Sequence, residues 1–375
     1  MKNLKIPICY VLFSGGLDSR LALKIMQEQQ YTNKDLDNKD IEKNVSKKLD
    51  NKHTDLAFQA RVKCEDKSIS IENENYNQNK QQHKNLTHTD GLHQKFRIIA
   101  LTYKLPFGSG CCQPDCSFNF TQVQGIEHKI IDCNQGKLFK KYLKIVSKPK
   151  FGHGSGINPC IDCRIFILNE TKKILKPGDF IVTGEVLGER PMSQHKKAML
   201  TIDEETKLKG KILRPLSAKL LETTEPEKNN LVNREKLFNI SGRSRKPQIA
   251  LANHYHISYP TPAGGCLLCE QVFSERLHDL FSRKQLNNIT HTDVDLLKIG
   301  RHFFFPKFKV IVGRNHKENL LLEGLANKKT DKVFTLKSLP GPSVLLQGKI
   351  NEESIEKAKE LLLKFSKNKD EIVEK

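Results

Sequence analysis

The sequence predicts an α/β protein with a doubly wound parallel sheet and a smaller α+β domain at its C-terminal end. Three observations support this. Short apolar runs alternate with segments of helical periodicity, the first apolar run ends in a Gly-Gly turn, and a separate basic piece begins near residue 300. Strands that alternate with helices form parallel sheets, whose ligands bind at the carboxyl ends of the strands.

Apolar segments and helical periodicity place the elements along the chain. IPIC at 6–9 suits a buried strand, and LALKIMQEQ resumes as a helix. Later segments continue the alternation, with strands expected at FRIIALTY, EHKIIDC and DFIVTG and helices at 138–147 and 164–175. A helical segment near 271–287, a strand SVLLQ and a closing helix at 351–366 follow.

The domain organisation is predicted from the segments in which strands and helices no longer alternate. Residues 32–95 are rich in Asn, Lys, Asp, Gln and His without apolar periodicity, which predicts a low-complexity, disordered insertion. The expected organisation is a first domain over 1–290 that contains this insertion, and a second over 300–375. The second domain has 16 Lys and Arg against 10 Asp and Glu, so it is basic.

Composition limits the classes of function. The 375 residues are 37% hydrophobic with a mean hydropathy of -0.53, and no run of 18 apolar residues occurs. We therefore expect a soluble, cytoplasmic protein without a membrane partner. A net charge of +20 favours a polyanionic partner, for which nucleic acid suits better than an acidic membrane surface. A lysine-rich solvated surface is the alternative interpretation.

The stretch VLFSGGLDSR follows the first predicted strand. Gly15 and Gly16 could simply form a tight turn into a helix that Asp18 or Ser19 caps. Alternatively, the backbone N–H groups that the glycines expose form an anion nest at a positive helix end, where phosphate binds. The loop matches neither the Walker A nor the G-x-G-x-x-G pattern.

Ten cysteines in a cytosolic chain are unsuited to structural disulfides, so their spacing matters more than their number. Cys160 with Cys163, and Cys266 with Cys269, form two CxxC pairs. Two such pairs fit zinc, an iron–sulfur cluster or a redox pair. A structural zinc site would need all four thiolates, whereas a cluster could use three. The composition assigns no role to the further cluster Cys111, Cys112 and Cys116.

The loop SGGLDS resembles that of the PP-loop ATP pyrophosphatases (adenine nucleotide α-hydrolase-like), through Ser14, Gly15, Gly16, Asp18 and Ser19. Members of that family bind ATP and release pyrophosphate while they adenylate a substrate. The resemblance implies that the loop amides hold the phosphates and that Asp18 positions Mg²⁺ or pyrophosphate.

The segments NPCIDC, TGEVLGERPMSQ, RPLSAKLL, GRSRK and PAGGCLL resemble a bacterial group of PP-loop proteins that thiolate tRNA. The resemblance implies that Gly184 and Glu185 form a second ATP-facing motif. It also implies phosphate or substrate contacts for three residues that follow: Arg190, Ser193 and Gln194. Arg243, Arg245 and Lys246 would hold tRNA phosphate.

The cysteine pattern is similar to that of the iron–sulfur-dependent tRNA 2-thiouridine synthetases. That resemblance implies that Cys160, Cys163 and Cys266 hold a [4Fe–4S] cluster, with Cys269 as a possible fourth ligand. The C-terminal piece resembles the RNA-binding module of the NFACT proteins, through GRNHKENLLLEG, KSLPGPSVLL and the closing helix.

The expected function is that of an ATP-dependent tRNA sulfurtransferase, a transferase that adenylates a uridine carbonyl oxygen and replaces it with sulfur. Three alternatives stay open: a PP-loop tRNA-modifying ligase with structural Zn²⁺, a persulfide-based 2-thiouridylase, and a non-enzymatic RNA-binding quality-control factor. Neither the sulfur donor, the choice between O2 and O4, nor the oligomeric state follows from the sequence.

Overall fold

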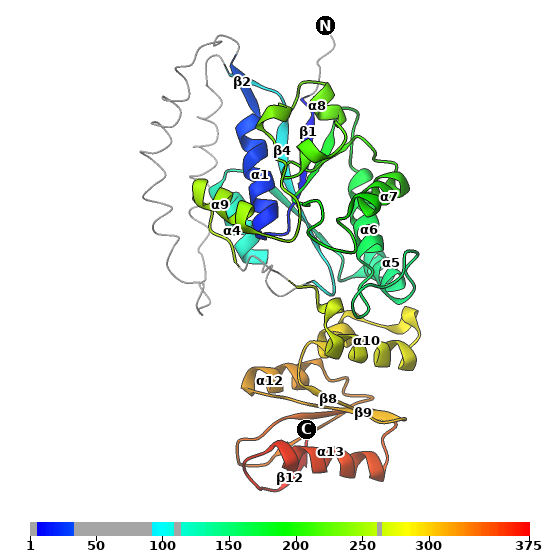
Figure 1. The fold of residues 1–375 in the computed structure, drawn as a ribbon. Coiled ribbons are helices and arrows are strands. Elements are labelled where there is room, and N and C mark those ends of the chain that lie inside the picture. Colours follow the sequence, from blue (N-terminus) through cyan, green and yellow to red (C-terminus); the bar gives the residue numbers. More distant parts are fainter. Residues whose placement is uncertain (1–5, 34–91, 109–113, 261–264) are drawn as a thin grey trace.

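The computed structural model describes residues 6–33, 92–108, 114–260 and 265–375, with the side chains of 33, 92 and 114–117 left out. Its first sheet has five parallel strands in the order β5-β4-β1-β6-β7 (Figure 1). These strands are β1 (Ile8–Leu12), β4 (Arg97–Lys104), β5 (Glu127–Asp132), β6 (Phe180–Thr183) and β7 (Ile212–Leu213). The predicted α/β class with a parallel sheet is confirmed.

The central strand β1 is buried on both faces, as expected in a parallel sheet that helices cover on each side. Side chains on a strand point alternately to opposite faces. Accordingly, Val11 packs into the core beneath α1 (Leu17–Gln29), whereas Tyr10 and Leu12 pack into the core on the other side. Every residue from 9 to 13 is therefore apolar and buried.

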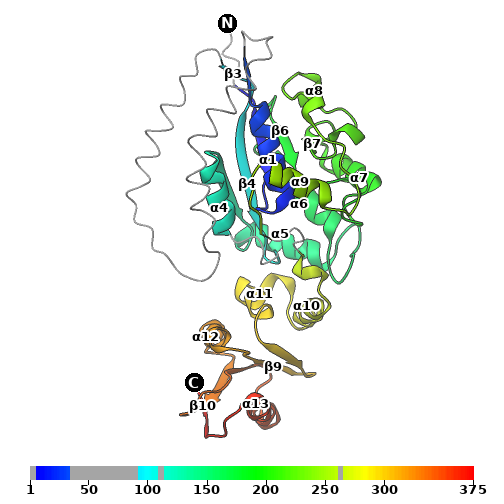
Figure 2. The same cartoon turned by 60° about the vertical axis from the view of Figure 1, so that its left-hand side comes forward.

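Helices cover the parallel sheet on both faces (Figure 2). One face carries α1, α4 (Pro114–Val123) and α9 (Lys246–His254). The other carries α5 (Gly136–Ser147), α6 (Cys160–Lys172) and α7 (Lys196–Thr206). The short helix α8 (Glu225–Lys228) lies in the long connection that follows β7.

The chain changes direction across the sheet at β1. Strands β4 and β5 lie on one side of β1, while β6 and β7 lie on the other. In doubly wound sheets, the loops at such a reversal diverge and leave a crevice at the carboxyl ends of the strands. The loop at 14–16 follows β1 and the loop at 184–194 follows β6, so both lie at the carboxyl ends of the strands where the order reverses.

A second sheet forms the C-terminal module, which we define as residues 300–375. Its antiparallel strand order is β12-β10-β11-β9-β8, and α12 and α13 accompany it (Figure 1). The bounds are β8 (Arg301–Phe304), β9 (Phe308–Val312), α12 (His316–Leu325), β10 (Lys332–Leu336), β11 (Val344–Gly348), α13 (Glu352–Phe365) and β12 (Ile372–Glu374).

Two helices connect the two sheets, α10 (Gln271–Arg283) and α11 (His291–Leu297). Val294 and Leu297 of α11 pack in the core that also holds α5 and α6. Leu296, on another side of α11, packs against Ile311 and Leu345 of the C-terminal module. Helix α11 therefore contributes to the cores on both sides of the connection.

Both ends of the expected insertion at 32–95 take part in a short two-stranded ribbon. Strand β2 (Tyr31–Asn33) pairs antiparallel with β3 (Leu92–Gln94), and Asn33 lies opposite Leu92. Polar strands without apolar periodicity give no sequence signal, so the sequence alone does not separate these ends from the insertion. Residues 34–91 lie outside the described part of the structure, so the prediction stays open for them.

One helix begins earlier than predicted. The sequence suggests a helix over 164–175, but α6 spans Cys160–Lys172, so both cysteines of the first CxxC pair lie in its first turn. Cysteine has a low helix propensity, and Pro159 fits just before the helix. In the described part of the chain, no helix is long and apolar enough to cross a membrane.

Candidate functional site

The turn after β1 has the geometry that the SGGLDS sequence predicts. Gly15 has a φ of 79°, which favours glycine, and Gly16 precedes α1 in an extended conformation. No side chain caps the helix there. The first turn of an α-helix carries N–H groups without intrahelical acceptors, and these attract anions.

The buried Arg20 holds the back of this turn. Its Nε donates to the Gly15 carbonyl oxygen at 2.7 Å, and its Nη1 donates to the Ser258 carbonyl oxygen at 2.7 Å. The guanidinium also lies 4.6 Å from the centre of the Phe120 ring. These contacts hold the carbonyl group of Gly15 in place.

The loop that follows β6 packs directly on the first turn of α1. A Cβ built on Gly184 would lie 2.6 Å from the carbonyl carbon of Asp18 and 2.7 Å from the nitrogen of Ser19. Real Cβ atoms do not approach backbone so closely, so only glycine permits this contact. The two motifs predicted to face ATP are therefore adjacent, although 165 residues separate Ser19 from Gly184.

Asp18 belongs to an ionic cluster with residues of two other loops. Arg245 Nη1 donates to Asp18 Oδ2 at 3.3 Å, and its Nη2 donates to Glu189 Oε1 at 2.6 Å. Glu189 Oε2 accepts from Gln248 Nε2 at 3.1 Å. Within the described residues, the buried Asp18 Oδ1 has no hydrogen-bond partner.

The environment of Asp18 raises the pKa of its carboxyl to about 6. Burial contributes most, and the charge of Glu189 adds to it, while Arg245 and Arg190 oppose both. Burial removes the water that stabilises a carboxylate, so the charged form is disfavoured. A cation that reaches the free oxygen would stabilise the charged form of this carboxylate.

Glu185 lies in a buried ion network. Its Oε2 accepts from Arg214 Nε at 2.9 Å, and its Oε1 is 3.3 Å from Arg164 Nε. Arg214 also donates to both carboxylate oxygens of Asp203, at 2.7 and 3.0 Å. Burial alone would raise the pKa of Glu185, but the two arginines outweigh it and hold the pKa below its usual value. A contact between Glu185 and ATP stays a prediction.

The two CxxC segments meet near the N-terminus of α6. Ile157 N donates to the Leu268 carbonyl oxygen at 2.9 Å, which joins the two segments through their backbones. Asn158 Nδ2 donates to Cys269 Sγ at 3.0 Å. None of the six described cysteines forms a disulfide: Cys9, Cys133, Cys160, Cys163, Cys266 and Cys269. Cys111 and Cys112, and the side chain of Cys116, lie outside the described residues.

The thiols of this region lie close enough to influence one another. Burial raises the pKa of Cys163 to about 11 and that of Cys266 to about 12. The charge of Cys160 adds to both shifts, and Cys163 and Cys269 add to that of Cys266. Even so, no three His, Cys, Asp or Glu side chains among the described residues converge closely enough to hold a metal ion.

Ser193 connects the thiol of Cys160 to the loop that follows β6. Cys160 Sγ donates to Ser193 Oγ at 3.2 Å, and Ser193 is fully buried. In the same loop, Gln194 Oε1 accepts from Arg190 N at 3.2 Å. The loop at 184–194 therefore begins against α1 and ends against the first turn of α6.

The three predicted RNA-binding residues face different surroundings. Arg243 and Lys246 are exposed. Arg245, between them, is only 19% exposed and contacts Asp18 and Glu189. Alternation of this kind within one loop has no signature in the sequence, because the three side chains are chemically alike.

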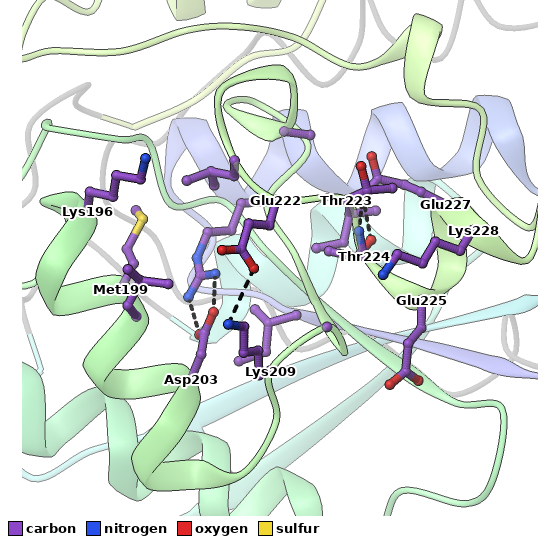
Figure 3. Close-up of a pocket in the computed structure, with 17 residues that line it drawn as sticks. Lys196, Met199, Asp203, Lys209, Glu222, Thr223, Thr224, Glu225, Glu227 and Lys228 are labelled. Carbon is purple, nitrogen blue, oxygen red and sulfur yellow. Dashed lines mark hydrogen bonds and ion pairs between the residues drawn. The ribbon is translucent and has the colours of Figure 1, made fainter.

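A cavity of about 240 Å³ lies elsewhere, between α7, the end of β7 and α8 (Figure 3). Charged groups around it already pair with one another: Asp203 with Arg214, and Lys209 with Glu222 at 3.5 Å. This pocket is separate from the loops at 14–19 and 241–246, whose residues do not line it. Arg214, which lines this cavity, also contacts Glu185 of the candidate site.

Several residues of the site were missed by sequence reasoning. Arg20 and Glu189 lie within or beside the quoted motifs, SGGLDSR and GER, so they could have been included. Tyr142, whose hydroxyl lies 3.4 Å from Cys163 Sγ, gives no such signal. The helical spacing of apolar residues in α5 predicts that an aromatic residue at this position lies in the core, and Tyr142 is indeed buried.

Comparisons with known proteins cover the chain unevenly. Residues 300–374 match the family model described as the NFACT protein RNA binding domain. No curated protein matches the chain significantly. Among solved structures, one similar chain is the U34-tRNA thiolase NcsA from Methanococcus maripaludis with its [4Fe-4S] cluster. The two sequences are 15% identical, and the superposition has a TM-score of 0.31 and covers 78% of this chain and 71% of that chain. At such a TM-score, the likeness carries no argument. The C-terminal module is thus similar to an RNA-binding domain.

Proposed function

We propose that the protein is an ATP-dependent tRNA sulfurtransferase of the PP-loop type. The observation that carries the proposal is that the loop at 184–194 contacts both the SGGLDS turn and a thiol of the first CxxC pair. Gly184 packs on the backbone of Asp18 in the SGGLDS turn, and Ser193 contacts the thiol of Cys160. A reaction that adenylates a substrate and then delivers sulfur needs these two groups side by side.

In the first half-reaction, the loop would bind ATP and a uracil carbonyl oxygen of tRNA would attack the α-phosphorus. Pyrophosphate leaves, and the oxygen becomes part of an AMP ester. The proposed binding residues for ATP are Ser14, Gly15, Gly16, Asp18, Ser19, Gly184 and Glu185, with Asp18 near Mg²⁺. Open amides at the start of α1 suit the phosphate oxygens, and the free oxygen of Asp18 suits a cation.

In the second half-reaction, sulfide from a donor attacks the activated carbon, and AMP leaves with the former carbonyl oxygen. The proposed sulfur-handling residues are Cys160, Cys163 and Cys266, with Cys269 as a possible fourth. These free thiols belong to adjoining segments, and soft thiolates suit iron–sulfur ligation, so the donor set fits a [4Fe–4S] cluster in kind. A cluster held by three thiolates would supply an iron with an open position for sulfide.

The C-terminal module would hold the tRNA. It matches an RNA-binding domain model and carries a net charge of +6. Exposed Arg243 and Lys246 would add phosphate contacts near the reaction site. We place such an enzyme in the cytoplasm, where its tRNA substrate is found.

A zinc-containing ligase is the second candidate, and one observation favours it. Cys269 Sγ accepts from Asn158 Nδ2 at 3.0 Å, so a fourth thiol adjoins the segment that carries Cys160 and Cys163. Zinc in a structural site takes four such ligands and takes no part in the reaction.

Three measurements test the proposal. ATP–pyrophosphate exchange in the presence of tRNA checks adenylation, absorption near 400 nm in anaerobically purified protein checks the cluster, and mass spectrometry of tRNA nucleosides from a deletion strain checks for a missing thiouridine. Failure of exchange together with an unchanged nucleoside profile would leave an RNA-binding factor as the better description.

Variants of the four cysteines distinguish cluster from zinc. In a three-thiolate cluster, Cys269→Ser keeps iron and thiolation, whereas Cys160→Ala, Cys163→Ala and Cys266→Ala lose both and still adenylate. In a closed zinc site, all four variants lose metal and stability together. Stoichiometric zinc that disappears equally in the four variants would overturn the sulfurtransferase proposal.

A further inference from the structure

Arg245 occupies a position that RNA binding does not explain. Its guanidinium reaches 3.3 Å from Asp18 Oδ2 and 2.6 Å from Glu189 Oε1, whereas Arg243 and Lys246 on either side are exposed. The side chain thus lies at the turn of SGGLDS, 227 residues away in sequence from Asp18. A residue that only contacted tRNA from outside would have no need of this buried pairing.

The surroundings hold this guanidinium firmly in place. Glu189 is 4% exposed, and its second oxygen accepts from Gln248 Nε2, one turn along α9 from Arg245. The loops that carry Glu189 and Arg245 are also joined by their backbones, since Gly242 N donates to the Leu187 carbonyl oxygen at 2.7 Å. Glu189 therefore fixes both the position and the direction of Arg245.

The charges at this point suit a polyphosphate. Asp18 lies in the uncapped first turn of α1, and its side chain contacts the guanidinium of Arg245. Arginine presents a planar fork of donors that binds phosphate oxygens in pairs, and it stays charged at every relevant pH. A phosphate chain seated on the amides would offer this fork new acceptors in place of the Asp18 oxygen.

We infer that Arg245 is a phosphate-binding residue of the nucleotide site and that Glu189 is its positioning residue. The inference rests on the proposed ATP site and adds to it a residue from a distant loop. The phosphates concerned are those of the nucleotide rather than those of RNA, because Arg245 contacts Asp18 in the first turn of α1, directly after the two glycines of SGGLDS. Within the GRSRK motif, Arg243 and Lys246 are left to face the RNA.

Calorimetric titration of the full chain with MgATP, AMP and inorganic pyrophosphate tests this inference. We expect Arg245→Gln to weaken binding of ATP and pyrophosphate at least tenfold and to change AMP binding much less. The ratio of ATP to AMP affinity is decisive, because a general loosening of the fold would lower both. Arg243→Gln is the matched control, since it removes the same charge two residues away and should keep ATP affinity within twofold.

Two further variants keep the test valid should Arg245→Gln fold poorly. Arg245→Lys keeps the charge but loses the fork, and Glu189→Gln keeps the size but loses the counter-charge; each should lower the ATP to AMP ratio by a smaller factor. Thermal melting confirms that both are folded.

The outcomes distinguish the proposed function from the role of Arg245. Wild-type protein that binds neither ATP nor pyrophosphate would overturn the proposed function and this inference together. Wild-type protein that binds ATP, with Arg245→Gln unchanged in its ATP to AMP ratio, would overturn the inference alone. A loss of tRNA affinity in that variant, measured by filter binding with ATP affinity intact, would instead assign Arg245 to the RNA.

Discussion

The helices of the candidate site begin differently from those of the C-terminal module. Helix α1 starts after Gly16 and α6 starts after Pro159, and neither residue offers a side-chain cap. Helices α12 and α13 start after Asn315 and Asn351, whose side chains accept from the third residue of each helix. Side-chain caps stabilise a helix, whereas open N–H groups remain available to a ligand. The N–H groups at the starts of α1 and α6 are thus not engaged by a capping side chain, as the proposed function requires of α1.

Charged groups show the same contrast. In the C-terminal module, Glu318 is held by Arg314 one turn away, and that pairing keeps the pKa of Glu318 below its usual value. At the candidate site, Asp18 is paired through one oxygen only and its pKa is raised. Active sites commonly hold polar groups in such unfavourable states, and substitutions there often stabilise the fold.

The largest effect is expected from Gly16→Val. The φ of Gly16 is -77°, and a Cβ placed on this residue would lie 3.6 Å from its nearest neighbour, so the backbone accepts a side chain. Two methyl groups over the amides would keep phosphate at a distance, so ATP binding should be lost while the fold survives. Calorimetry with MgATP and circular dichroism measure the two properties.

A glycine in the C-terminal module provides the control for that experiment. A Cβ on Gly324 in α12 meets no atom within 4 Å, so Gly324→Ala should keep ATP affinity and slightly stabilise the helix. Wild-type ATP affinity in Gly16→Val would contradict the assignment of the open helix end to phosphate.

The second effect concerns pH. Asp18 has a pKa of about 6 in the folded protein, against an ordinary value of about 4, so the folded state binds its proton more tightly. Its contribution to stability is therefore fully present below pH 4, is lost as the pH rises from 4 to 6, and stays lost above. Asp18→Asn should thus be more stable than wild type at pH 8, with the difference vanishing near pH 4.

Urea unfolding of both proteins between pH 4 and pH 8 measures this difference. A constant difference across the range would show that Asp18 is not held in an unfavourable ionised state.

The third effect concerns the capped helices. Asn351→Ala removes the acceptor for Ser354 N, so the free energy of unfolding of the C-terminal module should fall by about 1 kcal/mol. ATP affinity should stay unchanged, because α13 packs against the antiparallel sheet of the C-terminal module and not against the parallel sheet. Thermal melting measures the loss, with the exposed Lys349→Ala as a control. An equal loss in the control would show that the cap has no specific contribution.

The smallest effect is expected from removal of residues 34–91. Asn33 lies opposite Leu92 in the β2–β3 ribbon, so an Asn-Gly turn can join the two strands directly. The segment holds 11 Lys and Arg against 11 Asp and Glu, so its loss leaves the net charge unchanged, and tRNA affinity should fall only slightly through the lost lysines. Adenylation and melting temperature are the measurements, and a misfolded or inactive product would contradict the assignment of 32–95 to an insertion.

Local patterns in the sequence predicted most of the parallel sheet. The strands at β1, β4 and β6 contain continuous apolar runs, which are typical of buried parallel strands. The edge strand β5 has only Ile130 and Ile131 as apolar residues and is largely exposed. The short strand β7 and the helix α7 were not predicted. Two residues are too few for a periodic signal, and α7 holds charged residues on much of its surface.

The sequence by itself determined which residues could bind phosphate and sulfur, because glycines after a strand and paired cysteines are rare combinations with few chemical uses. Tertiary structure alone decided their arrangement. Only folding shows that Gly184 lies on Asp18, that Ser193 contacts Cys160, and that Arg245 faces the turn while Arg243 faces solvent. The reason is physical: a motif specifies its own backbone geometry, but contacts between segments far apart in the chain depend on how the strands are ordered in the sheet and on what packs between them.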